Sequence, residues 1–169
     1  MKNNQEAYNM NKTAVQILKA GLLVGTLDIL AAFFYFFVQT GNDKVLIVLK
    51  YIASGVFGES AMSGGVEMLI AGLVLHYIIA FAFTLVFFWL FPKIKMAKQH
   101  TVLSGVLYGA FVWAVMNLVV VPHSKIGSRP FDWENALINL LILIVCMGIP
   151  LSLMAHTFYK RKGVATLAY

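Results

Sequence analysis

The hydrophobic pattern of the chain consists of four long apolar stretches separated by shorter polar segments. The stretches cover residues 13–38, 66–91, 101–121 and 133–159. A helix needs about 20 apolar residues to cross a hydrocarbon core about 30 Å thick, and each stretch reaches that length. The pattern therefore predicts an all-α fold, a polytopic membrane bundle of four transmembrane helices that forms one integral membrane domain over residues 1–169.

A shorter apolar run, residues 44–58, lies between the first two spans. It is too short to cross the membrane and too apolar for an ordinary loop. On a helix its larger apolar residues share one face and its polar residues, including Ser54, the other; the apolar face consists of Val45, Val48, Leu49, Ile52 and Val56. A helix lying along the outer interface and a short re-entrant segment both fit this pattern. An extension of the first helical hairpin that serves only packing fits it as well.

The composition agrees with a membrane protein. Apolar residues make up 60% of the chain and charged residues 12%, whereas soluble domains have roughly 45–50% and about 25%. The spans leave no room for a separate soluble domain. The single cysteine, Cys146, excludes an intrachain disulfide and a cysteine-rich metal site.

The basic residues indicate an orientation in the membrane. Three flanks that share one side carry nine of the thirteen basic residues: Lys2, Lys12 and Lys19; Lys93, Lys95 and Lys98; Lys160, Arg161 and Lys162. The other two loops carry Lys44, Lys50, Lys125 and Arg129. By the positive-inside rule, we expect both termini of this multi-pass protein to be cytoplasmic. Since these residues lie beside apolar runs, we expect contact with membrane lipid and none with nucleic acid.

An acidic residue, Asp28, interrupts the first span within GTLDILAAFF. Gly21, Gly25, Asp28 and Ala32 fall on one stripe of a helix. Small residues at this spacing allow another helix to approach closely. We therefore expect Asp28 to face protein and not lipid.

His76 in the second span lies at a similar predicted depth. Counted from Val38 and Val66, Asp28 and His76 are each about 15 Å below the outer ends of their spans. We expect them to meet near the middle of the membrane and to line a polar pocket open to the outer side, with further residues Tyr77, Trp113, Asn117 and Asn139. Ionisable residues inside a membrane often mark proton or ligand paths. In an alternative interpretation, these polar groups only hydrogen-bond the helices to each other.

Two further features concern helix packing. The pair Gly105 and Gly109 in the third span repeats the spacing of Gly21 and Gly25, and both pairs are candidates for packing within one chain or between copies. Pro150 in the fourth span removes a backbone donor and frees the carbonyl of Cys146, which predicts a kink. This kink is a candidate hinge, although proline in membrane helices also serves packing alone.

The chain carries no motif of a known catalytic centre. It has no Gly-x-Ser-x-Gly elbow, His-Glu-x-x-His pair, P-loop or dinucleotide fingerprint. The histidines lie at different depths, which disfavours a shared metal site or a haem held by two histidines. We therefore expect no enzyme activity, catalytic residue, metal or cofactor.

Several stretches are similar to a known family. They are His76 followed by an apolar helix ending in FPKIK, Met116 preceding Pro122, and Pro130-Phe131-Asp132-Trp133-Glu134-Asn135 at the start of the last helix. Over about the C-terminal 95 residues the chain resembles the YagU family of small bacterial inner-membrane proteins. The resemblance implies a multi-pass inner-membrane protein without an established biochemical activity, and it implies no active-site residues.

Two functional hypotheses follow. In the first, the bundle forms a pathway for a small solute, an ion or protons, centred on Asp28 and His76, and a bundle this small would then act as a homo-oligomer. In the second, the protein is a non-catalytic membrane partner or scaffold subunit, with residues 44–58 as the docking element. An enzyme acting on lipid or quinone ranks third.

Overall fold

The fold is described from a computed structural model that covers the backbone of residues 2–94, 99–127 and 132–166 and the side chains of residues 10–94, 99–127 and 132–161. Several residues on which sequence-based predictions rest lie outside the described side chains: Lys2, Lys95, Lys98, Arg129, Pro130, Phe131 and Lys162.

The described residues form four long helical units and two short helices, and none of them lies in a β-strand. The first unit is α1 (Lys2–Thr40), and the second is α4 (Val66–Leu90) with the 3₁₀ turn η1 (Phe91–Lys93). The third comprises α6 (Thr101–Val115), the π-helical turn η2 (Met116–Val120) and α7 (Val121–His123). The fourth comprises α8 (Trp133–Leu143), the π-helical turn η3 (Ile144–Gly148) and α9 (Ile149–Thr166). Two short helices, α2 (Ile47–Phe57) and α3 (Ser60–Ser63), connect α1 to α4.

Each long unit contains a segment that is long and apolar enough to cross a membrane: Met10–Thr40, Val66–Lys93, Thr101–His123 and Trp133–Arg161. Large apolar side chains cover the outer surfaces of these segments; for example, Phe34, Leu118 and Leu137 are 70%, 62% and 58% exposed. An apolar surface of this extent is unsuited to water and suited to lipid. The prediction of an all-α membrane protein with four membrane-crossing helices is confirmed.

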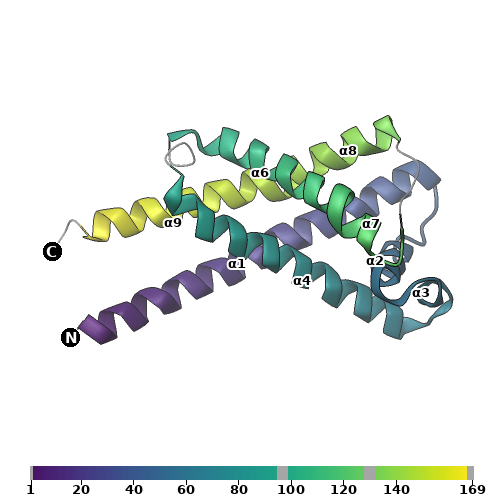
Figure 1. Cartoon of the computed structure of the whole chain (residues 1–169), viewed down its shortest axis with the longest axis horizontal. Coiled ribbons are helices and arrows are strands. Elements are labelled where there is room, and N and C mark those ends of the chain that lie inside the picture. Colours follow the sequence, from purple (N-terminus) through teal and green to yellow (C-terminus); the bar gives the residue numbers. More distant parts are fainter. Residues whose placement is uncertain (1, 95–98, 128–131, 167–169) are drawn as a thin grey trace.

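The long units run lengthwise through the molecule, and the start of α1 lies at the same end as the end of α9 (Figure 1). This end is called here the terminal end. The short helices α2 and α3 lie at the opposite end, called here the α2 end. α1 has 39 residues and is therefore about 58 Å long at 1.5 Å per residue. It extends well beyond a hydrocarbon core of about 30 Å.

Gly21 and Gly25 lie where α1 crosses α4. A Cβ atom added at Gly21 would lie 2.4 Å from the ring of Phe81, and one added at Gly25 would lie 3.0 Å from the ring of Tyr77. Larger residues on this stripe would force the two helices apart.

Gly105 and Gly109 lie where α6 packs against η3. A Cβ atom at Gly105 would lie 2.8 Å from the backbone oxygen of Gly148, and one at Gly109 would lie 2.6 Å from the Cα atom of Ile144. Both predicted glycine pairs thus form contacts within the chain. A surface for a homo-oligomer would have to involve other residues.

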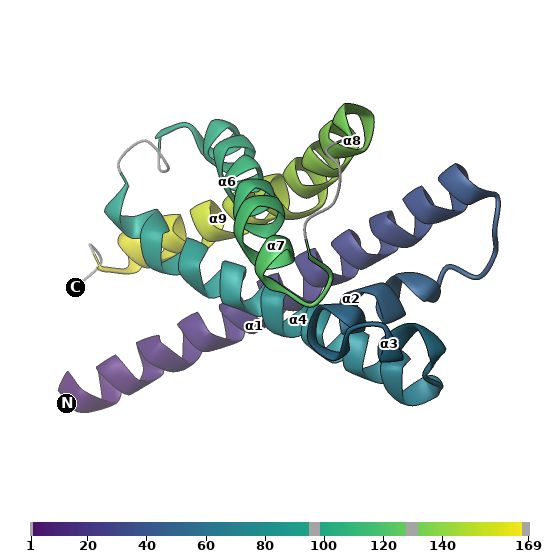
Figure 2. The same ribbon diagram turned by 45° about the vertical axis from the view of Figure 1, so that its right-hand side comes forward.

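α2 lies alongside α4 at the α2 end (Figure 2). Gly72 permits this contact, because a Cβ atom there would lie 2.0 Å from the backbone oxygen of Leu49. Leu49, Ala53 and Ser54 are buried, whereas Val56 is 50% exposed. The side of α2 that packs on α4 therefore combines the apolar Leu49 with the small residues Ala53 and Ser54. A contact this close buries small side chains, whatever their polarity.

A cluster of buried side chains fills the half of the bundle nearer the termini. Its largest members are Phe87, Phe88, Phe91, Tyr108 and Leu151. The hydroxyl of Tyr108 donates to the carbonyl of Phe83 at 2.5 Å, and that of Tyr159 donates to the carbonyl of Phe88 at 2.8 Å. These bonds satisfy both phenols within apolar surroundings. Small buried polar residues of this half, Thr84, Ser104 and Ser152, bond to backbone carbonyls three or four residues earlier in the chain.

A single residue separates each of the two π-helical turns from the proline that follows it. The N–H of Ile149 bonds to the carbonyl of Ile144, five residues earlier, and Pro150 follows. η2 has the same bond immediately before Pro122. In an α-helix a proline ring collides with the carbonyl four residues earlier, and a wider turn relieves that collision. At Pro150, where the sequence predicts a kink, the helix thus contains a π-helical turn.

Candidate functional site

A large cavity lies between the helices in the half of the molecule nearer the α2 end. Its volume is about 1250 Å³. Most of its lining is apolar, and its polar lining residues are Asp28, Tyr35, Gln39, Tyr51, His76, Trp113, Asn117, Asp132, Asn135 and Asn139. Val24, Val112 and Met147 line it and also belong to the buried cluster. The cavity therefore ends on that cluster and extends to the α2 end, where Gln39 and Asp132 are exposed.

Asp28 supplies the deepest carboxylate of the cavity. It lies about 12 residues before the end of α1, which corresponds to about 18 Å along the helix. Its carboxylate is close enough to His76 and to Cys146 for an electrostatic interaction with each. None of the described residues donates a hydrogen bond to it. A half-buried carboxylate without a protein donor can bind a ligand, an ion or a proton.

His76 is held in place by a backbone carbonyl of α1. Its Nε2 lies 2.8 Å from the oxygen of Gly25. A carbonyl oxygen can only accept a hydrogen bond, so Nε2 carries the hydrogen and donates it. In the neutral ring Nδ1 is therefore the nitrogen that accepts a hydrogen bond. The bond joins α4 to α1 three residues before Asp28, which explains why the two ionisable groups share the cavity.

Asn117 and Asn139 each bond to their own helix. The amide nitrogen of Asn117 donates to the carbonyl of Trp113 at 2.9 Å, and that of Asn139 donates to the carbonyl of Asn135 at 2.7 Å. Within the part of the chain that the structure describes, neither amide bonds to another helix, which contradicts the interpretation of these two residues as interhelical bonds. Among the described residues, none donates to either amide oxygen.

Trp113 forms part of the cavity lining on α6. Its indole nitrogen is buried and has no hydrogen-bond partner among the described residues. An indole N–H can only donate. Trp113 therefore carries a buried donor that no acceptor among the described residues satisfies.

A hydrogen-bonded group, called here the mouth network, joins α1 to α8 at the α2 end. It consists of Tyr35, Gln39, Asp132 and Asn135. The hydroxyl of Tyr35 donates to Oδ1 of Asn135, and Nε2 of Gln39 donates to the Tyr35 hydroxyl at 2.7 Å. Nδ2 of Asn135 donates to Oδ2 of Asp132 at 2.6 Å. These bonds link the outer parts of the two helices at the cavity entrance.

Asp132 also caps the N-terminus of α8. Its Oδ1 accepts from the backbone N–H groups of Glu134 at 3.0 Å and Asn135 at 3.3 Å. The Asn135 side chain, followed by these backbone groups, holds the pKa of Asp132 below its usual range. Asp132 is thus a carboxylate at neutral pH and adds a negative charge at the entrance.

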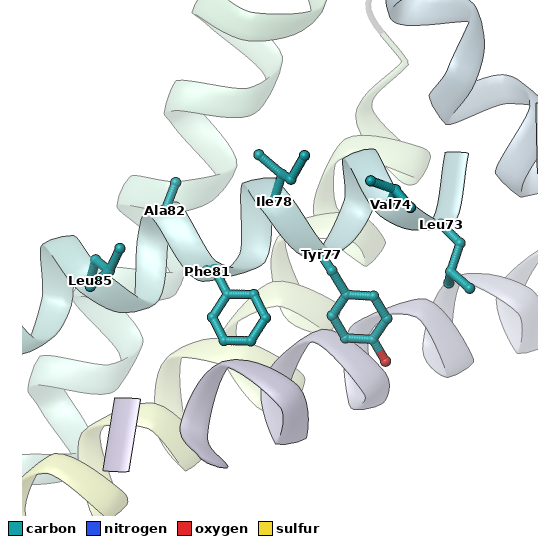
Figure 3. A pocket seen from close by; sticks show the side chains of 7 residues that line it. All are labelled: Leu73, Val74, Tyr77, Ile78, Phe81, Ala82 and Leu85. Carbon is teal, nitrogen blue, oxygen red and sulfur yellow. The ribbon is translucent and has the colours of Figure 1, made fainter. Parts of the chain in front are cut away.

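Tyr77 does not join the predicted site. Adjacent positions on a helix point about 100° apart, so Tyr77 faces away from the cavity that His76 lines. Its hydroxyl lies 2.7 Å from Oγ1 of Thr26. Its ring points toward α1 beside that of Phe81 (Figure 3), in an open apolar groove of about 530 Å³ on the outer face of α4. The apolar lining suits contact with lipid chains.

The cavity also contains polar residues that the sequence analysis missed. Tyr35 and Gln39 follow Asp28 and Ala32 at steps of three and four residues, so the stripe that identified Asp28 continues through them. Extending that stripe would have found both. Tyr51 on α2 lines the cavity because of the path of α2, which no local pattern indicates.

The cavity offers binding and proton-exchange chemistry. Among the described residues, no group of three or more His, Cys, Asp or Glu side chains is placed to hold a metal ion. The polar groups instead form a carboxylate, an oriented imidazole and amide oxygens around a mostly apolar space. Sites for small organic molecules combine apolar walls with a few placed polar groups in this way.

Searches for similar family models, curated proteins and solved structures found no match to this chain. Membership of the YagU family therefore stays a prediction.

Proposed function

We propose that this membrane protein is a small transport protein, and that the cavity is the site where a solute, an ion or a proton enters. The observation that carries the proposal is the convergence of Asp28 and His76, from two different helices, on one cavity that extends to the α2 end. A scaffold would need no such space.

The energetic cost of Asp28 supports a functional role. An aspartate at the centre of a membrane helix costs about 2.5–3.5 kcal/mol on insertion scales. No described side chain repays this cost with a hydrogen bond to the carboxylate. A purely structural carboxylate would be expected to have such a partner.

The basic flanks suggest the direction of access. If the termini face the cytoplasm of a bacterium, as the positive-inside rule predicts, the α2 end faces outward across the inner membrane. The cavity would then receive its solute from outside. The start of α1 and the end of α9 lie at one end of the molecule, as expected if both termini are on one side of the membrane (Figure 1).

The buried cluster favours a carrier mechanism over an open channel. Phe87, Phe88 and Tyr108 fill the bundle between the cavity and the terminal end. A solute bound beside Asp28 could continue only after these side chains separate. The mouth network would then form the barrier at the opposite end of the cavity. Its hydrogen bonds would break when the buried cluster is closed and form again when the cluster opens.

The first test measures proton movement. Purified protein in liposomes should dissipate an imposed pH gradient, and Asp28→Asn should reduce this rate at least about tenfold, because an amide cannot exchange the proton. Asp43→Asn is the matched control, since Asp43 is exposed in the loop after α1. We expect the control to retain the wild-type rate.

A folded Asp28→Asn variant with the wild-type rate would contradict a proton pathway through this residue. No flux from the wild-type protein, with protons or with a bound solute, would favour the alternative of a membrane partner or scaffold subunit. For that alternative, the exposed Val56 and Phe57 on α2 form the candidate docking surface, with 50% and 43% exposure. We assign no catalytic step.

A further inference from the structure

We propose that the solute of this cavity is a protonated amine with an apolar body, such as an arylalkylammonium ion. The inference rests on the proposed function, in which the cavity binds a solute, and it names the chemical class of that solute.

The charge of the lining favours a cation. Asp28 lies deep in the cavity and Asp132 at its entrance, and none of the described lining residues is lysine or arginine. His76 is the remaining ionisable base among them, and its Nε2–H donates to Gly25 and not to a carboxylate. An anionic solute would be repelled by both carboxylates, and His76 is the single described lining residue able to offset that repulsion.

The polar groups favour a solute that donates hydrogen bonds. The Asp28 carboxylate and the amide oxygens of Asn117 and Asn139 are all acceptors that no described residue uses. The two asparagines keep this arrangement, because each amide nitrogen is bonded to its own helix. An ammonium group with N–H bonds satisfies such acceptors, whereas a quaternary ammonium ion does not.

The size and the walls of the cavity favour an apolar body. A volume of about 1250 Å³ exceeds the usual range of roughly 300–1000 Å³ for sites of drug-sized ligands. An inorganic ion would fill only a small part of it. The rings of Phe36, Tyr51, Phe83 and Trp113 line the space. Aromatic rings attract organic cations through their faces and exclude water from the apolar part.

The test compares three probes with similar bodies on the full-length protein in phosphatidylcholine nanodiscs. They are phenethylammonium, its N-trimethyl analogue and phenylpropionate. Equilibrium dialysis, with empty nanodiscs as the blank, should find saturable binding of phenethylammonium, weaker binding of the trimethyl analogue and none of phenylpropionate. The comparison needs no variant, so it remains valid if a variant fails to fold.

Variants then locate the binding. Asp28→Asn should weaken phenethylammonium binding by about 10- to 100-fold, the loss expected for a charge-assisted hydrogen bond. The control Asp43→Asn should bind normally. Replacing Asn117 and Asn139 together by leucine should remove the preference for phenethylammonium over its trimethyl analogue. Equal binding of phenylpropionate, no saturable amine binding, or full affinity in a folded Asp28→Asn protein would each overturn the inference.

These results separate the inference from the proposed function. Proton flux that depends on Asp28, without amine binding, would refute the amine and leave the transport role intact. Amine binding that depends on Asp28, without flux of protons or amine, would support the site and refute transport.

Discussion

At the scale of single residues, His76 contributes two separate properties to the site. Its Nε2–H bonds α4 to the Gly25 carbonyl of α1, and its other ring nitrogen, Nδ1, is the atom through which the proposed pathway would pass a proton. A glutamine keeps a donor at a similar distance from the backbone but does not titrate. A leucine lacks both properties, so the two substitutions separate structure from function.

We expect His76→Leu to lower the free energy of unfolding by about 1 kcal/mol, the usual value of one hydrogen bond between membrane helices. His76→Gln should unfold at the wild-type temperature, while both variants should lose proton flux. Thermal unfolding in detergent and liposome flux measure the two effects. Wild-type flux in His76→Gln would show that the imidazole does not carry the proton.

Single residues also show the limits of prediction from this sequence. The meeting of Asp28 and His76 in one cavity was predictable because equal counts from the outer ends gave equal depths. Depth alone did not give direction, and Tyr77, at nearly the same depth, faces another side of α4. The direction in which a side chain points depends on which neighbouring helix packs against its own. Here the close contact at Gly25 places Tyr77 against α1.

At the scale of helices, the positions of the spans follow from length and hydropathy alone. Each span must carry about 20 apolar residues whatever surrounds it, and the prediction 66–91 corresponds to Val66–Lys93 in the structure. The path of α2 was not predictable in this way. It depends on Gly72, a residue of another helix, and therefore on tertiary contact.

We expect Gly72→Ala to destabilise the protein by about 1–3 kcal/mol, the usual cost of overpacking, because its Cβ would lie 2.0 Å from the backbone oxygen of Leu49. Gly55→Ala on α2 is the matched control, since its Cβ would meet other atoms only at 3.7 Å. The control should be neutral or slightly stabilising. Thermal unfolding compares them, and equal effects would mean that α2 does not pack on α4 as described.

The π-helical turns also combine a feature that the local sequence predicts with one that depends on tertiary contact. Pro122 and Pro150 are visible in the sequence, and a disturbance near them was predictable. The choice between a kink and a wider turn depends on how the neighbouring helix packs. In η3 the backbone lies against Gly105 and Gly109, where a sharp bend would open the contact.

At the scale of the whole molecule, the protein divides into a packed half near the termini and a hollow half near the α2 end. The packed half holds the aromatic cluster, and the hollow half holds the cavity with Asp28 and His76. The sequence already suggested a polar pocket, but neither its size nor its closed inner end. Both depend on how the four units diverge, which no single segment encodes.

Water access to this cavity from one side of the membrane is the central claim, and thiol labelling tests it most directly. Asn139→Cys would be made in a Cys146→Ser background, since Cys146 is the only cysteine of the chain. Val145→Cys is the control on the outer surface, where Val145 is 59% exposed and faces lipid. A membrane-impermeant thiol reagent would be added to two preparations of sealed vesicles, one with the α2 end outside and one with the terminal end outside.

We expect the Asn139→Cys variant to react from the side of the α2 end and the Val145→Cys variant to stay unreacted, because a thiol ionises in a wet cavity and not in lipid. Both variants should react after denaturation, which shows that each introduced thiol is intact. Labelling of Asn139→Cys only from the terminal side, or no more labelling than Val145→Cys, would contradict the cavity and the function proposed for it.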